Sequence, residues 1–260
     1  MPTPREHISY SELKDWAHCP HYHKKAWVEK VAPFEGNEYT AFGSAIHDVC
    51  EKKLLKEDIN PTQLFQLGFA KRIQQLLEKN IEFNPTNVQQ MKRAGPEILA
   101  EVDDALQDYF GDYEVFSSEE MLYVPIENFN IYFKGFVDAV VKVGDTYHLF
   151  DWKTCSWGWD SRKKSEKMVT YQLTLYKHFF CLKHGIDPEN VETHFALLKR
   201  TAKKDRVEIF RVTSGAKKTE NALKLLYQAI YNITKKFAIK NRLNCHKPYP
   251  CKLLNTHHCP

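Results

Sequence analysis

The sequence lacks the features that mark membrane-spanning and secreted proteins. No apolar run is long enough to cross a bilayer, and residues 1–7 contain no apolar signal core. Internal repeats and low-complexity tracts are also missing. We therefore expect a globular protein without membrane contact in the cytoplasm, or in the host cytoplasm if the source is a virus.

A strong charge imbalance is missing as well. The 37 Lys and Arg residues exceed the 33 Asp and Glu residues by only four, which permits nucleic-acid binding without requiring it. Basic residues nevertheless gather within 162–167 and 199–206. Most such clusters are solvated surface, but these two follow the candidate site at 133–153. Five residues are candidate phosphate contacts: Lys163, Lys164, Lys199, Arg200 and Lys203.

The chain has seven cysteines, and without a signal core a disulfide framework is not expected. Three of these cysteines, Cys50, Cys155 and Cys181, are expected in the interior. The other four lie near the two ends of the chain: Cys19, Cys245, Cys251 and Cys259.

Hydrophobic periodicity predicts helices over 9–30, 41–56, 61–80, 89–110, 164–184 and 216–239. It predicts strands over 121–126, 131–143, 146–152, 191–198 and 207–212. Ser9 or Ser11 would cap the first helix, and Cys19-Pro20 would interrupt it. The order indicates a mixed α/β fold with a central mixed sheet flanked by helices. One domain is expected over 1–260, with a helical part (about 9–112), a core (about 113–213) and a C-terminal helix with a Cys-rich tail (214–260).

A predicted hairpin lies within residues 133–153. Gly144-Asp145 separates two strand-like runs and suits a two-residue turn. That turn fixes the register, because the numbers of paired residues must then sum to 289. Asp138 therefore lies opposite Asp151, and Lys153 shares their face because side chains alternate along a strand. The other face of the first strand is wholly apolar and is expected in a core: Phe133, Gly135, Val137, Ala139 and Val141.

Two carboxylates placed directly opposite each other repel, because their Cβ atoms lie about 4.5–5.5 Å apart. A divalent cation between Asp138 and Asp151 turns this repulsion into coordination. Lys153 would then lie beside the ion, where an ammonium group can orient water and stabilise charge on a phosphate. The tripeptide Asp-x-Lys alone is common on surface hairpins. The paired aspartates and the flanking Leu149, Phe150 and Trp152 favour a partly buried site instead.

Two helices offer supporting residues. His47 and Glu51 are four residues apart and share a helix face, so His47 is a candidate metal ligand, although a lone helix histidine more often bonds to solvent or backbone. Gln172 and Tyr176 also lie one turn apart. Gln172 is a candidate to hold a water or Lys153, and Tyr176 either stacks on a base or packs in the core.

Five motifs together resemble the RecB-type branch of the PD-(D/E)XK nuclease superfamily. In chain order they are Ser9-Tyr-Ser-Glu-Leu…Trp16…Cys19-Pro20, Gly43…His47…Glu51, Gly135-Phe-Val-Asp138, Asp151-Trp-Lys153 and Gln172…Tyr176. The resemblance covers about residues 9–200. It implies a single nuclease domain with a restriction-endonuclease-like core.

The resemblance also implies roles for these residues. His47, Asp138, Asp151 and the Trp152 carbonyl would bind one or two Mg²⁺ or Mn²⁺ ions. Lys153 would be the catalytic lysine, and Gln172 and Tyr176 would assist. A carboxylate on the preceding strand, Glu119 or Glu120, is a further candidate. The implied activity is hydrolysis of DNA phosphodiester bonds.

Some members of the branch hold an iron–sulfur cluster with one N-terminal and three C-terminal cysteines. Cys19, Cys245, Cys251 and Cys259 would supply that set for a [4Fe–4S] cluster. The spacing differs from the usual Cys-x₂-Cys-x₅-Cys, because five and seven residues separate the last three cysteines. Zinc held with His246, His257 or His258 is an alternative, as is a tail with free thiols.

The sequence therefore predicts a metal-dependent DNA nuclease. The resemblance implies an exonuclease acting on single strands or duplex ends in recombination, repair or virus replication, with a recombination or replication protein as partner. The alternative is a non-catalytic DNA-binding subunit of a nuclease complex. Such subunits usually lose the lysine or a carboxylate, and this chain retains Lys153, Asp138 and Asp151.

Overall fold

The computed structural model describes residues 6–31, 34–246 and 251–259. The prediction of no signal core therefore rests largely on residues outside the described ranges. Within them the chain forms two compact units. Unit 1 comprises 1–34, 122–135 and 215–260, and unit 2 comprises 35–121 and 136–214. The expected single domain stays a prediction.

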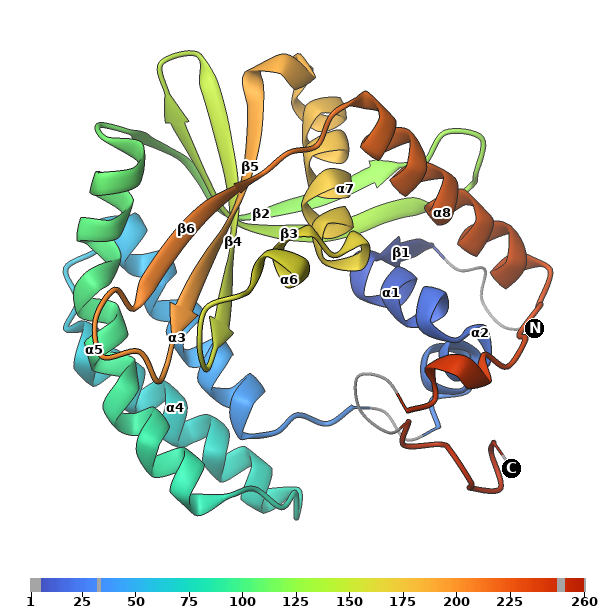
Figure 1. The fold of residues 1–260 in the computed structure, drawn as a ribbon, viewed down its shortest axis with the longest axis horizontal. Helices are drawn as coiled ribbons and strands as arrows, with labels where there is room; N and C mark the ends of the chain where they lie inside the picture. Colours follow the sequence, from blue (N-terminus) through green and yellow to red (C-terminus); the bar gives the residue numbers. More distant parts are fainter. Residues whose placement is uncertain (1–5, 32–33, 247–250, 260) are drawn as a thin grey trace. The chain divides into compact units, whose positions relative to one another are not determined.

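The strands form a mixed sheet, as the sequence predicts (Figure 1). They are β1 (His7–Ser9), β2 (Glu114–Pro125), β3 (Tyr132–Val143), β4 (Thr146–Cys155), β5 (Val191–Lys199) and β6 (Val207–Val212). Their order is β1-β3-β4-β5-β6, with β2 also paired to β3. The β1–β3 and β4–β5 pairs are parallel, whereas β3–β4 and β5–β6 are antiparallel.

In unit 2, three helices cover one face of the sheet: α3 (Glu38–Leu54), α4 (Pro61–Glu78) and α5 (Pro85–Phe110). Asn60-Pro61 and Asn84-Pro85 begin α4 and α5, because the asparagine caps the first turn and proline needs no hydrogen-bond partner there. The buried face includes Phe150 and Trp152 of β4. Gly95 of α5 has no room for a side chain, since a Cβ atom would lie 2.2 Å from Phe65.

The other face of β4 and β5 packs against α7 (Lys167–His184), which follows the short α6 (Ser161–Ser165). The sequence predicts one helix over 164–184, but Glu166 adopts an extended ψ of 127° and separates the two. The apolar face predicted for β3 is buried throughout: Phe133, Gly135, Val137, Ala139 and Val141.

Unit 1 contains β1, α1 (Tyr10–His18), α2 (Pro20–His23), a π-helical turn at Lys24–Val28, α8 (Ala216–Thr234) and a 3-10 turn at Arg242–Asn244. Ser9 caps α1 by accepting a hydrogen bond from the Glu12 N–H at 3.3 Å. Cys19 is extended, with φ of −160°, so the predicted interruption at Cys19-Pro20 is confirmed.

Several predicted boundaries are wrong. The strand β1, which has only three residues, was not predicted, and β2 starts at Glu114 rather than at the predicted Met121. The last helix, α8, ends at Thr234 rather than at the predicted Ile239. Among the residues that the structure describes, no helix combines the length and apolar character needed to cross a bilayer.

Candidate active site

The β3–β4 hairpin has the predicted register. Pairs run from Val143–Thr146 to Ala139–Phe150, and each pair sums to 289. Gly144 adopts a φ of 57°, which glycine tolerates at the first position of a two-residue turn. The paired residues of the ladder end one residue short of Asp138 and Asp151.

Beyond the last pair of the ladder, Asp138 bonds to β4 through its side chain. Its Oδ2 atom accepts a hydrogen bond of 2.7 Å from the Trp152 backbone N–H. The carboxylate is thereby fixed beside β4. The same oxygen lies 3.5 Å from Nδ1 of His47, which comes from α3.

Asp151 is 2% exposed, yet it contacts two polar side chains. Its Oδ2 forms an ion pair with the Lys153 ammonium, although no hydrogen bond of regular geometry reaches this oxygen. Its Oδ1 accepts a 2.7 Å hydrogen bond from Nε2 of Gln172 on α7. Gln172 therefore holds Asp151, rather than Lys153 as one sequence-based interpretation had it.

Tyr176 lies one turn beyond Gln172 on α7. The Gln172 amide reaches the Tyr176 hydroxyl at 3.3 Å. Tyr176 is 7% exposed, which agrees with the packed-core interpretation rather than with base stacking. Burial, followed by the charge on Asp151, raises the pKa of Tyr176, so its hydroxyl stays protonated.

The cluster of Asp138, Asp151 and Lys153 carries more negative than positive charge. Burial, then repulsion from Asp151, raises the pKa of Asp138 well above its usual range. Burial alone would lower the pKa of Lys153, but the two carboxylates outweigh it and raise that pKa. One ammonium group thus lies among two carboxylates, of which Asp151 is buried.

His47 is available as a neutral ligand. Burial is the main cause that lowers the pKa of His47 to about 4, and the charge on Asp151 offsets this only in part. A neutral imidazole has a free lone pair at pH 7. Two carboxylates, a neutral imidazole and a nearby backbone carbonyl form a donor set that fits a divalent cation.

The structure distinguishes the two candidate glutamates of β2. Glu120 is held by Lys183 and His184 of α7, with atoms 2.6 and 2.8 Å apart. Glu119 has a left-handed φ of 49°, and burial followed by nearby acidic groups raises its pKa. Those acidic groups are Glu51, Asp48 and Asp151. Glu119 therefore faces the acidic side of the site. The alternation of side chains along a regular strand does not predict this orientation.

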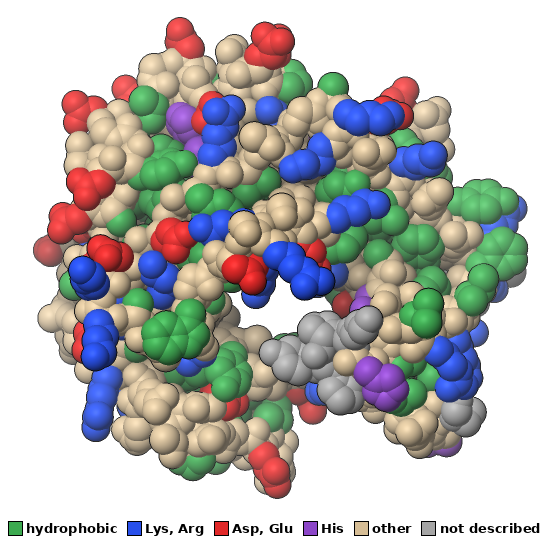
Figure 2. All heavy atoms as spheres, viewed as in Figure 1, with side chains coloured by type: hydrophobic (Ala, Val, Ile, Leu, Met, Phe, Trp, Pro, Cys, Tyr) green, Lys and Arg blue, Asp and Glu red, His purple; other side chains and the backbone are tan. Residues whose placement is uncertain are grey.

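The predicted basic residues are only partly free to bind phosphate. Lys164 and Lys199 both contact the Glu208 carboxylate, at 2.5 and 3.3 Å. Lys163 lies 4.8 Å above the Trp159 ring, and Lys203 is exposed. Figure 2 shows acidic and basic side chains interspersed over the visible face, consistent with the small net charge.

Several basic residues gather around Cys155, on the same face of β4 as Lys153. Burial raises the pKa of Cys155 to about 11 despite the opposing charges of Lys163, Lys199 and Arg200. These cations therefore lie at the end of β4, beyond Lys153. Cys155 is half-buried, whereas Cys50 and Cys181 are buried as predicted.

Trp157 is a candidate residue that was not predicted from the sequence. It follows β4 and is 67% exposed. Its neighbour Ser156 accepts a hydrogen bond of 2.6 Å from Arg200. An exposed aromatic beside a cation offers a stacking surface. Its position four residues after Lys153 is the sequence signal that could have identified it.

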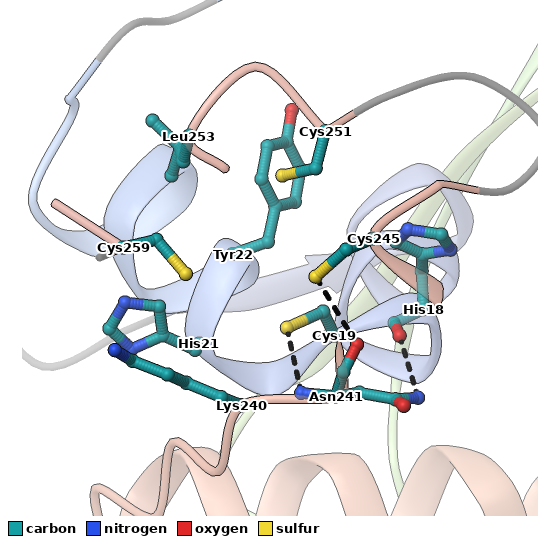
Figure 3. A pocket seen from close by; sticks show the side chains of 10 residues that line it. All are labelled: His18, Cys19, His21, Tyr22, Lys240, Asn241, Cys245, Cys251, Leu253 and Cys259. Atoms are coloured by element: carbon teal, nitrogen blue, oxygen red, sulfur yellow. Dashed lines mark hydrogen bonds between the residues drawn. The ribbon is translucent and has the colours of Figure 1, made fainter. Parts of the chain in front are cut away.

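The four terminal cysteines meet in unit 1. Cys19, Cys245, Cys251 and Cys259 line one pocket, with their sulfur atoms directed toward it (Figure 3). Burial, then the neighbouring cysteines, raises the pKa of Cys245. All seven cysteines of the chain are free.

Hydrogen bonds hold the tail against α1. The Asn241 N–H reaches Sγ of Cys19 at 3.3 Å, and Sγ of Cys245 donates to the Asn241 carbonyl at 3.7 Å. The Asn241 and Asn244 side chains both donate to the His18 carbonyl. Of the described histidines, His18 and His21 line the pocket, whereas the predicted zinc candidates His246, His257 and His258 do not.

Comparison with known proteins identifies the family. The model of the PD-(D/E)XK nuclease superfamily matches residues 7–260. The chain belongs to this superfamily. A search of curated proteins found no match.

Two solved structures are similar to this chain. A candidate exonuclease from Eubacterium rectale aligns over 96% of this chain and 86% of its own, with 14% identity and a TM-score of 0.57. The protein SSO0001 aligns over 92% and 85%, with 12% identity and a TM-score of 0.39. The first match shows that this chain shares the fold of that protein.

Proposed function

We propose that this chain is a metal-dependent DNA nuclease that hydrolyses phosphodiester bonds as an exonuclease, in recombination, repair or virus replication. One observation carries the proposal. Side chains from three separate elements, α3, the β3–β4 hairpin and α7, converge on Asp138 and Asp151. They do so in a member of a nuclease superfamily.

His47, Asp138, Asp151 and the Trp152 carbonyl would hold one or two Mg²⁺ or Mn²⁺ ions. Oδ2 of Asp151 accepts no hydrogen bond of regular geometry, and the pKa of Asp138 is raised; both observations support a cation at this position. When bound, such an ion supplies Lewis-acid activation of water and of the phosphate. Gln172 acts as a positioning residue, because it fixes the Asp151 carboxylate.

Lys153 is proposed as the catalytic lysine. Its raised pKa keeps it charged at neutral pH, and its side chain is 32% exposed although the partner carboxylate is buried. The ammonium is therefore both anchored and accessible. From this position it orients the attacking water and stabilises charge that develops on a phosphate oxygen.

DNA would approach along the end of β4. Lys163, Arg200 and Lys203 offer phosphate contacts, and Trp157 offers a ring on which a base can stack. The exonuclease assignment is supported by the sequence resemblance and by the similarity to the Eubacterium rectale candidate exonuclease.

The assay that tests this function uses four substrates. End-labelled linear and circular DNA, each single- and double-stranded, are incubated with Mg²⁺, Mn²⁺ or EDTA. We expect metal-dependent loss of linear DNA and survival of closed circles. Cleavage of circular DNA would indicate an endonuclease instead of an exonuclease. Tight DNA binding without cleavage would instead indicate a non-catalytic subunit of a nuclease complex.

The four-cysteine pocket is proposed to hold a [4Fe–4S] cluster. A zinc ion with Zn–S bonds of about 2.3 Å requires sulfur atoms about 3.8 Å apart. Within the described ranges, however, no three cysteine sulfurs all lie within 4.8 Å of one another. The wider arrangement favours a larger group, and the Asn241 N–H contact to Cys19 is typical of cluster ligands.

Anaerobic purification tests this assignment. The protein should be brown, absorb near roughly 400 nm and contain iron and sulfide. Cys245→Ser should lose the colour, whereas Cys181→Ser on α7 should keep it. A colourless wild-type protein with one zinc ion in the pocket would overturn the assignment.

A further inference from the structure

Three ligand-type side chains meet on β4 and β5, outside the candidate nuclease site. They are His148, Glu192 and His194. His148 pairs with Glu192, and Phe150 pairs with His194, so all three side chains project from one face of the sheet. Asp151 and Lys153 project from the opposite face, because side chains alternate along β4. The cluster is therefore separate from the nuclease site.

The three potential ligand atoms form a compact triangle. Nδ1 of His148 lies 3.0 Å from Nε2 of His194. Oε2 of Glu192 lies 3.8 Å from the first nitrogen and 3.9 Å from the second. Ligands of a tetrahedral ion with bonds of about 2.0–2.1 Å lie about 3.3–3.4 Å apart. Shifts of about half an ångström would therefore bring all three atoms to coordinating distance.

Neighbouring groups orient two of the three side chains. The Tyr109 hydroxyl lies 3.2 Å from Nδ1 of His194, which leaves Nε2 directed at the cluster. Arg211 contacts Oε1 of Glu192 at 2.8 Å and leaves Oε2 free for the same centre. Outer contacts of this kind fix the tautomer and orientation of metal ligands.

The protonation of the cluster also suits a metal. Burial, then the charges of His148 and Arg211, lowers the pKa of His194 to about 3. Burial lowers the pKa of His148 as well. Both rings are therefore neutral at pH 7. One of the two facing nitrogens carries a hydrogen in the metal-free protein. Metal binding moves that hydrogen through solvent to the other nitrogen of the same ring, so this imidazole binds as its second tautomer.

We propose that His148, Glu192 and His194 form a second metal site that takes a borderline transition-metal ion of the Zn²⁺ class. Two imidazoles and one carboxylate suit Zn²⁺ better than Mg²⁺, which prefers oxygen ligands. Glu192 is 25% exposed, so water has access to the remaining position. The ion would tie β4 to β5 near the end of α5.

Co²⁺ titration tests the site, because cobalt replaces zinc and has visible absorption. Metal-free full-length protein is compared with His148→Gln, Glu192→Gln and, as matched control, His178→Gln on α7. Every variant retains the nuclease site and the four cysteines, so differences isolate this cluster. We expect both cluster variants to bind one Co²⁺ fewer than wild type, or to bind it at least ten-fold more weakly. The control should match wild type.

A thermal-shift measurement with Zn²⁺ gives a second readout. Zn²⁺ should raise the Tm of wild type more than that of Glu192→Gln. Because the Glu192 side chain is partly exposed, we expect this variant to fold. Tyr109→Phe should weaken Co²⁺ binding about ten-fold by releasing His194. Equal stoichiometry and affinity in wild type and both cluster variants would show that the residues form only a hydrogen-bonded histidine pair.

Discussion

The side-chain amide of Gln172 donates a 2.7 Å hydrogen bond to Oδ1 of Asp151. This bond joins α7 to the hairpin and orients a carboxylate that would otherwise be held only by Lys153. Asp151 is buried, so water cannot replace the amide. Under the proposed function, Gln172 therefore positions a metal ligand rather than contacting DNA.

Gln172→Ala should lower nuclease activity about 10–100-fold and raise the Mg²⁺ concentration needed for half-maximal rate. The physical cause is a less ordered Asp151 carboxylate. Activity is measured across a Mg²⁺ titration, with Leu182→Ala as the control on the same helix. An unchanged Mg²⁺ requirement would contradict the positioning role.

Asp138 should make the metal-free protein less stable as pH rises. Its folded-state pKa is raised by burial and then by Asp151, so the folded protein binds this proton more tightly than the unfolded chain. Stability is therefore greatest below the unfolded pKa and is lost as pH rises through the raised folded pKa. Each unit of raised pKa corresponds to about 1.4 kcal/mol.

Urea unfolding in EDTA at pH 5 and pH 8 checks this sign. Asp138→Asn keeps the acceptor for the Trp152 N–H and removes the buried charge, so it should be more stable than wild type at pH 8. The difference should shrink at lower pH. Mg²⁺ should stabilise wild type and not the variant. Equal pH dependence in the two proteins would argue against a strained carboxylate pair.

Trp157→Ala should weaken binding to single-stranded oligonucleotides by about ten-fold or more, because one stacked base contributes about 1–3 kcal/mol. Fluorescence anisotropy with a labelled oligothymidine measures the loss. Tyr231→Ala, which removes a 55% exposed aromatic from α8, should bind as wild type does. If both variants bind equally well, Trp157 lies off the DNA path.

Glu208 should oppose DNA binding, since it contacts Lys164 and Lys199. Glu208→Gln should increase DNA affinity and steepen its salt dependence, by a slope of up to about 0.7 for each released lysine on single strands. Affinity is measured at several salt concentrations. An unchanged slope would mean that neither lysine reaches a phosphate.

The hairpin was predictable because its determinants are local. Gly144-Asp145 fixes the turn, the turn fixes the register, and the register places Asp138 and Lys153 on one face. The capped helices α4 and α5 were recognisable for the same reason, although α5 begins four residues before its predicted start at Gln89. The convergence of His47 was inferred only from the family resemblance, because no local pattern relates α3 to β4.

Other features depend on contacts that sequence spacing does not encode. Every residue pair between β4 and β5 is separated by 44 residues in the sequence, so the meeting of His148 with His194 had no sequence signal. Glu119 was indistinguishable from Glu120 because its left-handed backbone breaks the alternation of β2. The pairing of Lys164 with Glu208 likewise joins α6 to β6.

The most direct test of the nuclease assignment is the cleavage rate of Lys153→Ala on linear DNA with saturating Mn²⁺. Lys142→Ala, on the same hairpin, is the matched control. We predict a loss of about 100-fold or more for Lys153→Ala, with DNA affinity near wild type, and little change for Lys142→Ala. Cleavage by purified Lys153→Ala at the wild-type rate would contradict it.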